Sequence, residues 1–410
     1  MSVRRINRQL QYSKFALFIY ASLIVDFYRK FTSNVVRLPV STTMFRNLVY
    51  VGLFLVLVPH EKRKAQYSKL TFIGIIFALI TGFSMLINWE RNATSLYIDL
   101  LLMFVSRLLP AYYIGTMIVG NEGELTKSIN QFQWLTLSYE ALILIYPEVS
   151  TTSYLTISGN LLIPTLFAVF SRSEGIRGLV QKVIGIIGLI VIVVYGGRTS
   201  MVSIILAVGL IFLVKFRKEY LRKKVIALFM LICVVIFVVV FYENIINYLL
   251  LQNPGSRTLK LIEKGQFFWS SNRDLYYNAA FDSFVNHPFR IYGFLGDRFY
   301  YADYFGSTGD NSYIATMFSH NSIIEIMLNF GVFFGALIDL YLIAKIIRAI
   351  RKLNRVDNET VWITYIIIFT SAFVAMFVSS SWLNDYTVWL LFGSVLTICH
   401  RTYGKKESQK

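Results

Sequence analysis

The sequence predicts an all-α integral membrane protein, and three observations support this fold class. Of the 410 residues, 56% are hydrophobic and only 15% are charged, whereas soluble domains carry about 25% charged residues. Apolar runs such as 183–194 and 225–241 are nearly free of charge, as expected of helices that cross a bilayer. Basic residues concentrate in alternate loops, which is typical of a chain that crosses a membrane repeatedly. Together these features exclude a soluble enzyme.

The sequence contains about 12 segments that could cross the membrane, because a crossing helix needs about 20 apolar residues. They lie near residues 15–31, 41–59, 70–88, 96–119, 129–146, 153–170, 183–196, 199–214, 225–243, 321–344, 360–380 and 386–400. The seventh and eighth are short and are joined by Gly196-Gly197-Arg198. A re-entrant pair is the alternative interpretation of these two.

The distribution of charge predicts the orientation of the chain. The formal net charge is +17, and most of the basic residues lie in the even-numbered loops and in both tails, as in the run 215–224. Since cytoplasmic loops attract Lys and Arg, both termini are predicted to be cytoplasmic in a multi-pass protein of the bacterial inner membrane. The excess of positive charge is then explained by the cytoplasmic loops of a membrane protein, so no nucleic-acid partner is expected.

Four regions follow from this topology. Residues 1–243 hold spans one to nine, 244–319 form a large extracytoplasmic loop, 320–400 hold spans ten to twelve, and 401–410 are a cytoplasmic tail. The loop is rich in aromatic residues, which suit sugar rings or the headgroup region. Within it, 257–285 has helical periodicity and 286–308 is rich in turn residues.

The residues on the outer side favour a site without a metal or other cofactor. Of the four histidines, only His287 and His320 are predicted to face outward, which is too few for a histidine metal cluster. No Asp-x-Asp or Asp-Asp pair occurs in the chain, although paired carboxylates are what Mg²⁺ or Mn²⁺ would need.

The chief candidates among the arginines on the outer side, where the positive-inside rule disfavours basic residues, are Arg198 and Arg273. Arg198 follows two glycines, which allow the backbone to approach a ligand closely, and Arg273 lies within the predicted loop helix, followed on the same face by Tyr277. The planar guanidinium can bind phosphate oxygens in two places. The alternatives are that Arg198 reaches lipid headgroups and that Arg273 lies on a solvated helix face.

His320-Asn321 opens the tenth predicted span, which continues through Glu325 to Gly331 and Gly335. The G-x-x-x-G spacing predicts close packing of this helix on a neighbour. A histidine at the membrane boundary can accept a proton from an attacking hydroxyl or orient it. The structural alternative is helix capping by Ser319 or Asn321.

The order of these features resembles the O-antigen polymerase and ligase superfamily of membrane glycosyltransferases. The ordered set is Gly-Gly-Arg-Thr-Ser at 196–200, Asn272-Arg273-Asp274, Asn286-His287-Pro288 with Gly293 and Gly296, and His320-Asn321 with Gly331 and Gly335. It covers about a third of the chain. The sequence departs from the family pattern at 290–293, where the glycine after His-Pro is displaced, and before Asn321, where the family has more histidines.

The resemblance implies catalytic roles for His320, Arg198 and Arg273, with Arg198, Arg273, Tyr277 and Asn321 contacting the substrate. Between the two activities of that family we favour a polymerase that joins polyprenyl-diphosphate-linked oligosaccharide repeat units into a surface polysaccharide, because the Ile, Phe, Lys and Asn usage indicates an AT-rich genome, as in many capsule-making bacteria. The lack of a metal-ligand pattern predicts metal-independent transfer, and a single displacement predicts inversion. Donor and acceptor glycans, the bilayer, and a flippase and chain-length regulator of the same pathway are the expected partners. The alternatives are ligase-type transfer of a finished glycan to lipid or protein, and a flippase, although no second half resembles the first as transporters usually show.

Overall fold

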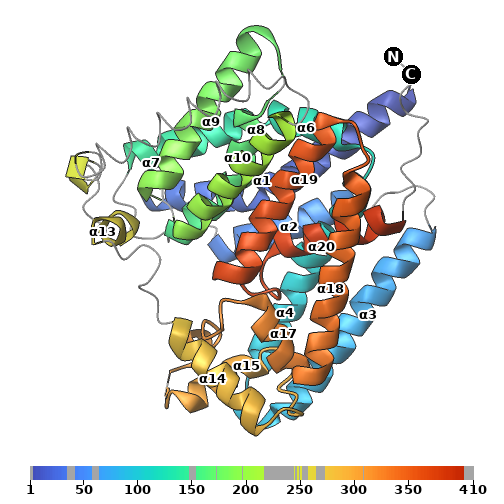
Figure 1. Cartoon of the computed structure of the whole chain (residues 1–410), viewed down its shortest axis with the longest axis vertical. Coiled ribbons are helices and arrows are strands. Elements are labelled where there is room, and N and C mark those ends of the chain that lie inside the picture. Colours follow the sequence, from blue (N-terminus) through green and yellow to red (C-terminus); the bar gives the residue numbers. More distant parts are fainter. Residues whose placement is uncertain are drawn as a thin grey trace. The chain divides into compact units, whose positions relative to one another are not determined.

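The computed structural model describes residues 3–34, 42–57, 64–146, 154–171, 173–195, 197–216, 244, 247–248, 250–251, 257–264, 273–307 and 309–400 (Figure 1). Within these ranges all regular elements are helices, as the sequence predicts. The ninth predicted span, 225–243, and the tail 401–410 lie outside the described residues. Two compact units are formed from interleaved parts of the chain.

Four helical segments among the described residues are long and apolar enough to cross a membrane: Ser68–Ile87, Thr94–Ile118, Gly175–Tyr195 and Glu359–Phe377. They overlap the predicted spans near 70–88, 96–119, 183–196 and 360–380. The segment predicted as short, 183–196, begins earlier than expected, at Gly175. The described part of the chain is therefore all-helical and the protein is an integral membrane protein, while the total of about 12 spans stays a prediction.

Unit 1 comprises 1–49, 122–270 and 358–371. Its helices are α1 (Val3–Asn34), α6 (Glu122–Gln131), α7 (Gln133–Ile145), α8 (Tyr154–Val169), α9 (Gly175–Tyr195), α10 (Arg198–Phe216), α13 (Arg257–Glu263) and the first part of α19 (Glu359–Val374). Helix α9 packs closely on α8, because a Cβ at Gly185 would lie 2.6 Å from the backbone nitrogen of Val169. Helix α1 lies against α6, α7 and α8.

Unit 2 comprises 50–121, 271–357 and 372–410. Its helices are α3 (Lys64–Ile87), the 3₁₀ turn η1 (Trp89–Arg91), α4 (Thr94–Met103), the π-helix η2 (Phe104–Leu108), α5 (Leu109–Ile118), α14 (Arg273–Asn286), α15 (Gly296–Tyr304), α16 (Asn311–Ile314), α17 (Ser322–Phe330), α18 (Val332–Leu353), the π-helix η3 (Ala375–Ser379) and α20 (Tyr386–His400). Helix α2 (Thr42–Leu57) has residues in both units. Helices α5 and α20 pack with their backbones almost touching, since a Cβ at Gly115 would lie 2.2 Å from the carbonyl oxygen of Leu390.

The predicted tenth span is not one continuous helix. The chain reverses at Gly331, whose φ of 78° and ψ of 155° suit only glycine. Helices α17 and α18 consequently form a hairpin, in which a Cβ at Gly335 would lie 2.4 Å from the Cα of Met327. The predicted close packing at the G-x-x-x-G pair therefore occurs within the segment, between its own two halves.

The loop also differs from its prediction in one place. Residues 286–308 are expected to be turns, but α15 forms at Gly296–Tyr304. This helix buries Asp297, Arg298 and Tyr301, so tertiary packing stabilises it although it begins with a glycine, Gly296. The predicted helix over 257–285 is observed as α13 and α14, and residues 265–272 between them lie outside the described residues.

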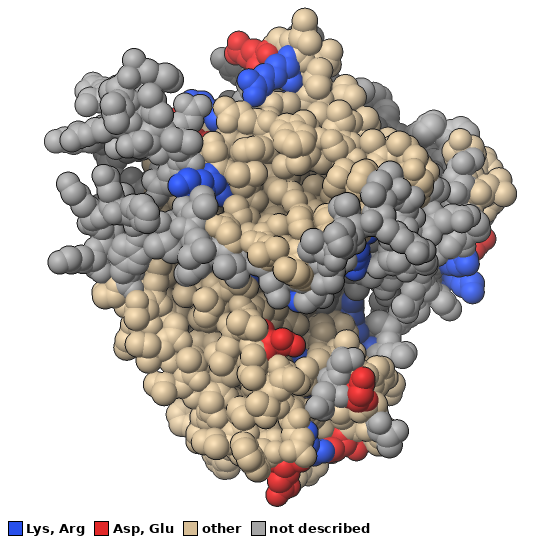
Figure 2. Space-filling model, turned by 180° about the vertical axis from the view of Figure 1, so that it is seen from behind, with Lys and Arg blue, Asp and Glu red and all other residues tan. Residues whose placement is uncertain are grey.

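The surface agrees with a lipid environment. Figure 2 shows broad areas of one face without Lys, Arg, Asp or Glu, and charged side chains in small separate areas. Large apolar side chains on the spanning helices are exposed, including Phe72, Leu79 and Leu86 of α3. Their exposure to water would be costly, whereas lipid tails accept them.

Candidate functional site

The centre of the candidate site in unit 2 is His320. Its φ is 55°, a left-handed conformation that is uncommon for a residue with a side chain. The next residue, Asn321, caps α17: its side-chain oxygen accepts hydrogen bonds from the backbone N–H groups of Ile323 (3.0 Å) and Ile324 (3.4 Å). The expected capping function of Asn321 is thus observed.

Aromatic side chains surround the His320 imidazole. The ring of Phe318 lies 4.2 Å from it, and the ring of Tyr276 approaches at 6.3 Å nearly perpendicular to it. Tyr276 also makes edge contacts with Tyr301 and Phe305. Because Tyr276 belongs to α14, these contacts place the loop helix beside the His320 segment.

Arg273 is the first residue of this same helix, α14. It precedes Tyr276 by three residues, or about one helical turn, and its side chain is half-buried. Tyr277 on the same helix is also half-buried. The structure therefore brings the helix that carries Arg273 and Tyr277 to the segment that carries His320 and Asn321.

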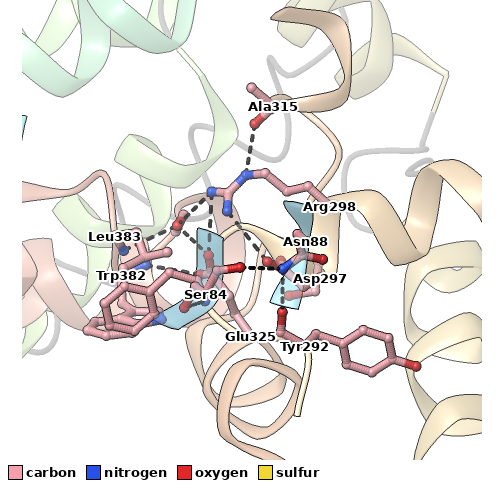
Figure 3. A network of polar contacts seen from close by, with 12 residues as sticks. Ser84, Asn88, Tyr292, Asp297, Arg298, Ala315, Glu325, Trp382 and Leu383 are labelled. Carbon is pink, nitrogen blue, oxygen red and sulfur yellow. Dashed lines mark hydrogen bonds and ion pairs between the residues drawn. The ribbon is translucent and has the colours of Figure 1, made fainter. Parts of the chain in front are cut away.

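A buried polar network contacts the chain before and after this segment, at Ala315 and Glu325 (Figure 3). Its central residue is Arg298 of α15, whose side chain is 1% exposed. The Arg298 Nε donates to the carbonyl oxygen of Ala315 at 2.9 Å, and Nη2 donates to the Ser381 hydroxyl at 3.1 Å. Nη2 also lies 3.5 Å from a carboxylate oxygen of Glu325, which is fully buried on α17.

Glu325 connects this network to the turn between η3 and α20. It accepts hydrogen bonds from the Ser381 hydroxyl at 2.5 Å and from the backbone N–H of Trp382 at 3.2 Å. The Ser381 oxygen also accepts the N–H of Leu383 at 3.2 Å. The charge and the hydrogen-bonding groups of Glu325 are therefore matched by partners, as a buried carboxylate requires.

Asp297 brings a second carboxylate to Arg298, with Oδ1 at 3.5 Å from Nη1. Burial raises the pKa of the Asp297 carboxyl to about 6, although the adjacent guanidinium acts in the opposite direction. Burial also raises the pKa of Tyr301 well above its ordinary value. The environment under the site is thus poorly hydrated, which strengthens the electrostatic interactions within it.

The strip 288–294 fixes the loop to the helices of unit 2. The N–H groups of Tyr292 and Gly293 donate to the carbonyl oxygens of Leu328 and Asn329 at 3.2 and 3.0 Å, which the last turn of α17 leaves without helical partners. On the other side, Asn88 donates to the carbonyl oxygen of Tyr292 at 2.9 Å and Ser84 accepts the N–H of Phe294 at 2.8 Å (Figure 3). Gly293 is required here because its φ is 75° and a Cβ would lie 2.7 Å from the Ser84 oxygen.

Arg198 belongs to unit 1, where it is the first residue of α10. The turn before it is fixed by a hydrogen bond of 3.1 Å from the Gly197 N–H to the Ser158 hydroxyl of α8. The Arg198 side chain lies outside the described side chains. Its convergence with Arg273 and His320 therefore stays a prediction.

Arg298 is the residue of this region that the sequence interpretation missed. The signal was an arginine in an outward loop directly after Gly296-Asp297, together with Glu325 inside an apolar segment. A charge inside an apolar segment requires a partner, but the sequence does not show that Arg298 is the partner of Glu325. Ser381 had no comparable signal in the sequence.

Comparison with known proteins agrees with this location. Residues 183–338 match the family described as O-antigen ligase, and this range includes Arg198, Arg273, Arg298 and His320. The match confirms the predicted resemblance to the O-antigen polymerase and ligase superfamily over this range. A search of curated proteins finds no match for the chain.

Proposed function

We propose that the protein is a polymerase that joins polyprenyl-diphosphate-linked oligosaccharide repeat units into a surface polysaccharide at the outer face of the bacterial inner membrane. The observation that carries the proposal is the contact of Tyr276 with His320. It joins the helix of Arg273 to the histidine within the segment that matches the O-antigen ligase family.

In the proposed reaction, a hydroxyl of the acceptor glycan attacks the anomeric carbon of the donor. The bond between that carbon and the diphosphate oxygen breaks, a glycosidic bond forms, and the polyprenyl diphosphate leaves with the bonding electrons. His320 accepts or orients the hydroxyl proton. Arg198 and Arg273 stabilise the negative charge that develops on the diphosphate, and a single displacement inverts the anomeric configuration.

Tyr277 and Asn321 are proposed to contact the substrate beside these groups. Both belong to elements that border the site, α14 and the first turn of α17. No metal is needed in this scheme, because two guanidinium groups supply the positive charge. A flippase and a chain-length regulator of the same pathway are the proposed protein partners.

The test compares Arg198→Ala, Arg273→Ala and His320→Ala with Lys260→Ala, which removes an exposed basic side chain from the same predicted loop. Loss of one such stabilising group costs about 10² to 10³ in rate, so the first three variants should leave single repeat units on a sizing gel. Lys260→Ala should make polymer of full length. Full-length polymer from Arg273→Ala at normal membrane levels would contradict the proposal.

A ligase is the second candidate, because the family description that matches is O-antigen ligase. The same gel separates the two functions. Loss of a polymerase leaves single repeat units, whereas loss of a ligase leaves long chains that stay on the lipid carrier. Translocation of lipid-linked glycan in vesicles without any change in glycan length would instead favour a flippase.

A further inference from the structure

We infer that Arg298 and Glu325 are positioning residues for His320, an inference that rests on the proposed function. Neither side chain is placed to touch the substrate, since their exposed fractions are 1% and 0%. Arg298 contacts the chain before His320, and Glu325 belongs to the helix that follows His320. Together with Ser381 they form what we name the clamp.

The first step of the argument is the strained conformation of His320. A residue with a side chain at a φ of 55° is strained and persists only where the surrounding structure enforces that conformation. The chain around His320 must therefore be held before and after this residue.

Arg298 holds the chain before His320. Its Nε–H bonds to the carbonyl oxygen of Ala315 at 2.9 Å, and its guanidinium lies 5.5 Å from the centre of the Phe318 ring. The Phe318 ring in turn contacts the imidazole at 4.2 Å. Arg298 thus fixes the segment 315–318 and, through Phe318, one face of the imidazole.

Glu325 holds the chain after His320. It lies one turn beyond Asn321 on α17, and its bonds to Ser381 and Trp382 fix that helix to the turn before α20. The separation of 3.5 Å between Arg298 Nη2 and Glu325 Oε1 joins the two anchors. The clamp therefore holds both ends of the segment 315–325, and the strained His320 lies between them.

A buried ion pair suits this function better than apolar packing would. Packing alone tolerates small shifts, whereas a guanidinium with two hydrogen bonds and two ion pairs defines the position of its partners more closely. Removal of Arg298 alone leaves the buried carboxylates of Glu325 and Asp297 without a cation, which is strongly destabilising. Removal of Glu325 alone leaves Asp297 as the partner of Arg298, and replacement of both members of the pair leaves a single carboxyl group, that of Asp297. This difference makes it possible to separate positioning from folding.

The experiment uses Arg298→Lys, Glu325→Gln and the double variant Arg298→Met/Glu325→Gln, in purified full-length protein with lipid-linked repeat units. The matched control is Glu122→Gln, which alters a buried carboxylate of unit 1 that accepts a 2.9 Å hydrogen bond from Tyr365. The clamp variants should lose at least about 10-fold in kcat, because a misplacement of about 1 Å can cost about 10²-fold. Their KM should stay near that of the wild type, and the midpoint of the pH–rate profile should move. The control Glu122→Gln should change neither kcat nor the midpoint of the pH–rate profile.

A second readout does not depend on glycan chemistry. Diethyl pyrocarbonate modifies imidazoles, and mass spectrometry can compare its rate at half-buried His320 with its rate at exposed His287. The ratio of the two rates should rise severalfold in the clamp variants and stay constant in Glu122→Gln. If the wild type makes no polymer, the proposed function fails and this ratio still tests the clamp. An unchanged ratio together with an unchanged kcat in a folded double variant would overturn the inference.

Discussion

Gly335 packs directly on Met327, because the hairpin of α17 and α18 brings the two backbones into contact. A Cβ at Gly335 would lie 2.4 Å from the Met327 Cα and 2.8 Å from the carbonyl oxygen of Ile326. These are backbone atoms, so the clash could be relieved only if the two helices moved apart. The hairpin positions α17 and with it the Asn321 cap and His320.

Gly335→Ala should therefore destabilise the protein. Overpacking of this kind costs about 1 to 3 kcal/mol, and the thermal unfolding midpoint of purified protein in detergent measures it. The matched control is Gly209→Ala in α10, where nothing lies within 4 Å of an added Cβ. That variant should be neutral or slightly more stable, since alanine favours helices over glycine by about 1 kcal/mol. Equal midpoints for the two variants would show that the hairpin contact is wrong.

The Asp297 carboxyl should make stability depend on pH. Its pKa is raised from 3.8 to about 6 by burial, so the folded state binds a proton more tightly than the unfolded chain. The resulting stabilisation is fully present below about pH 4 and is lost as the pH rises through about 6. A shift of this size corresponds to about 3 kcal/mol.

The measurement is the unfolding midpoint of the wild type and of Asp297→Asn between pH 4.5 and 7.5. The wild-type midpoint should fall over this range, and the fall should be smaller in Asp297→Asn. The variant should also be the more stable of the two at neutral pH, because Arg298 keeps Glu325 as its counter-ion. Parallel curves of unfolding midpoint against pH for both proteins would exclude Asp297 as the source of the pH dependence.

Asn321 allows capping to be separated from substrate binding. Its side-chain oxygen caps α17, and the loss of such a cap costs about 0.5 to 2 kcal/mol. Asn321→Ser keeps an oxygen that can cap, whereas Asn321→Ala does not. Both variants lack the amide that is proposed to contact the glycan.

If Asn321 contacts substrate, both variants should raise KM for lipid-linked repeat units, while only Asn321→Ala should lower the unfolding midpoint. Wild-type kinetics in Asn321→Ser would limit this residue to its structural function as a cap. The two measurements use the same purified proteins, so differences in expression do not affect the comparison.

The sequence predicted the helical fold class and the motifs of the site. It did not predict where the chain reverses or which of these residues contact one another. Composition and the length of apolar runs identify spans, because each helix that crosses the bilayer must by itself supply about 20 mostly apolar residues. The reversal at Gly331 was missed because an apolar segment has the same composition whether it is one helix or a hairpin. Arg298 was missed because its burial depends on Ser381 and Glu325, which are distant from it in the sequence and are brought together only by folding.

The remaining prediction concerns the orientation of the chain, which the distribution of basic residues alone supports. In a background with Cys233 and Cys399 replaced by Ser, the substitutions Asp282→Cys and Arg355→Cys place single thiols in the predicted outer loop and in a predicted cytoplasmic loop. Asp282 and Arg355 are both exposed in the structure, so burial does not limit labelling at either position. A membrane-impermeant maleimide should label the first thiol in intact spheroplasts and the second only after the membrane is permeabilised. Because the lipid-linked substrates are proposed to react at the outer face, labelling in the opposite order would place Arg273 and His320 in the cytoplasm and remove the basis for the proposed reaction.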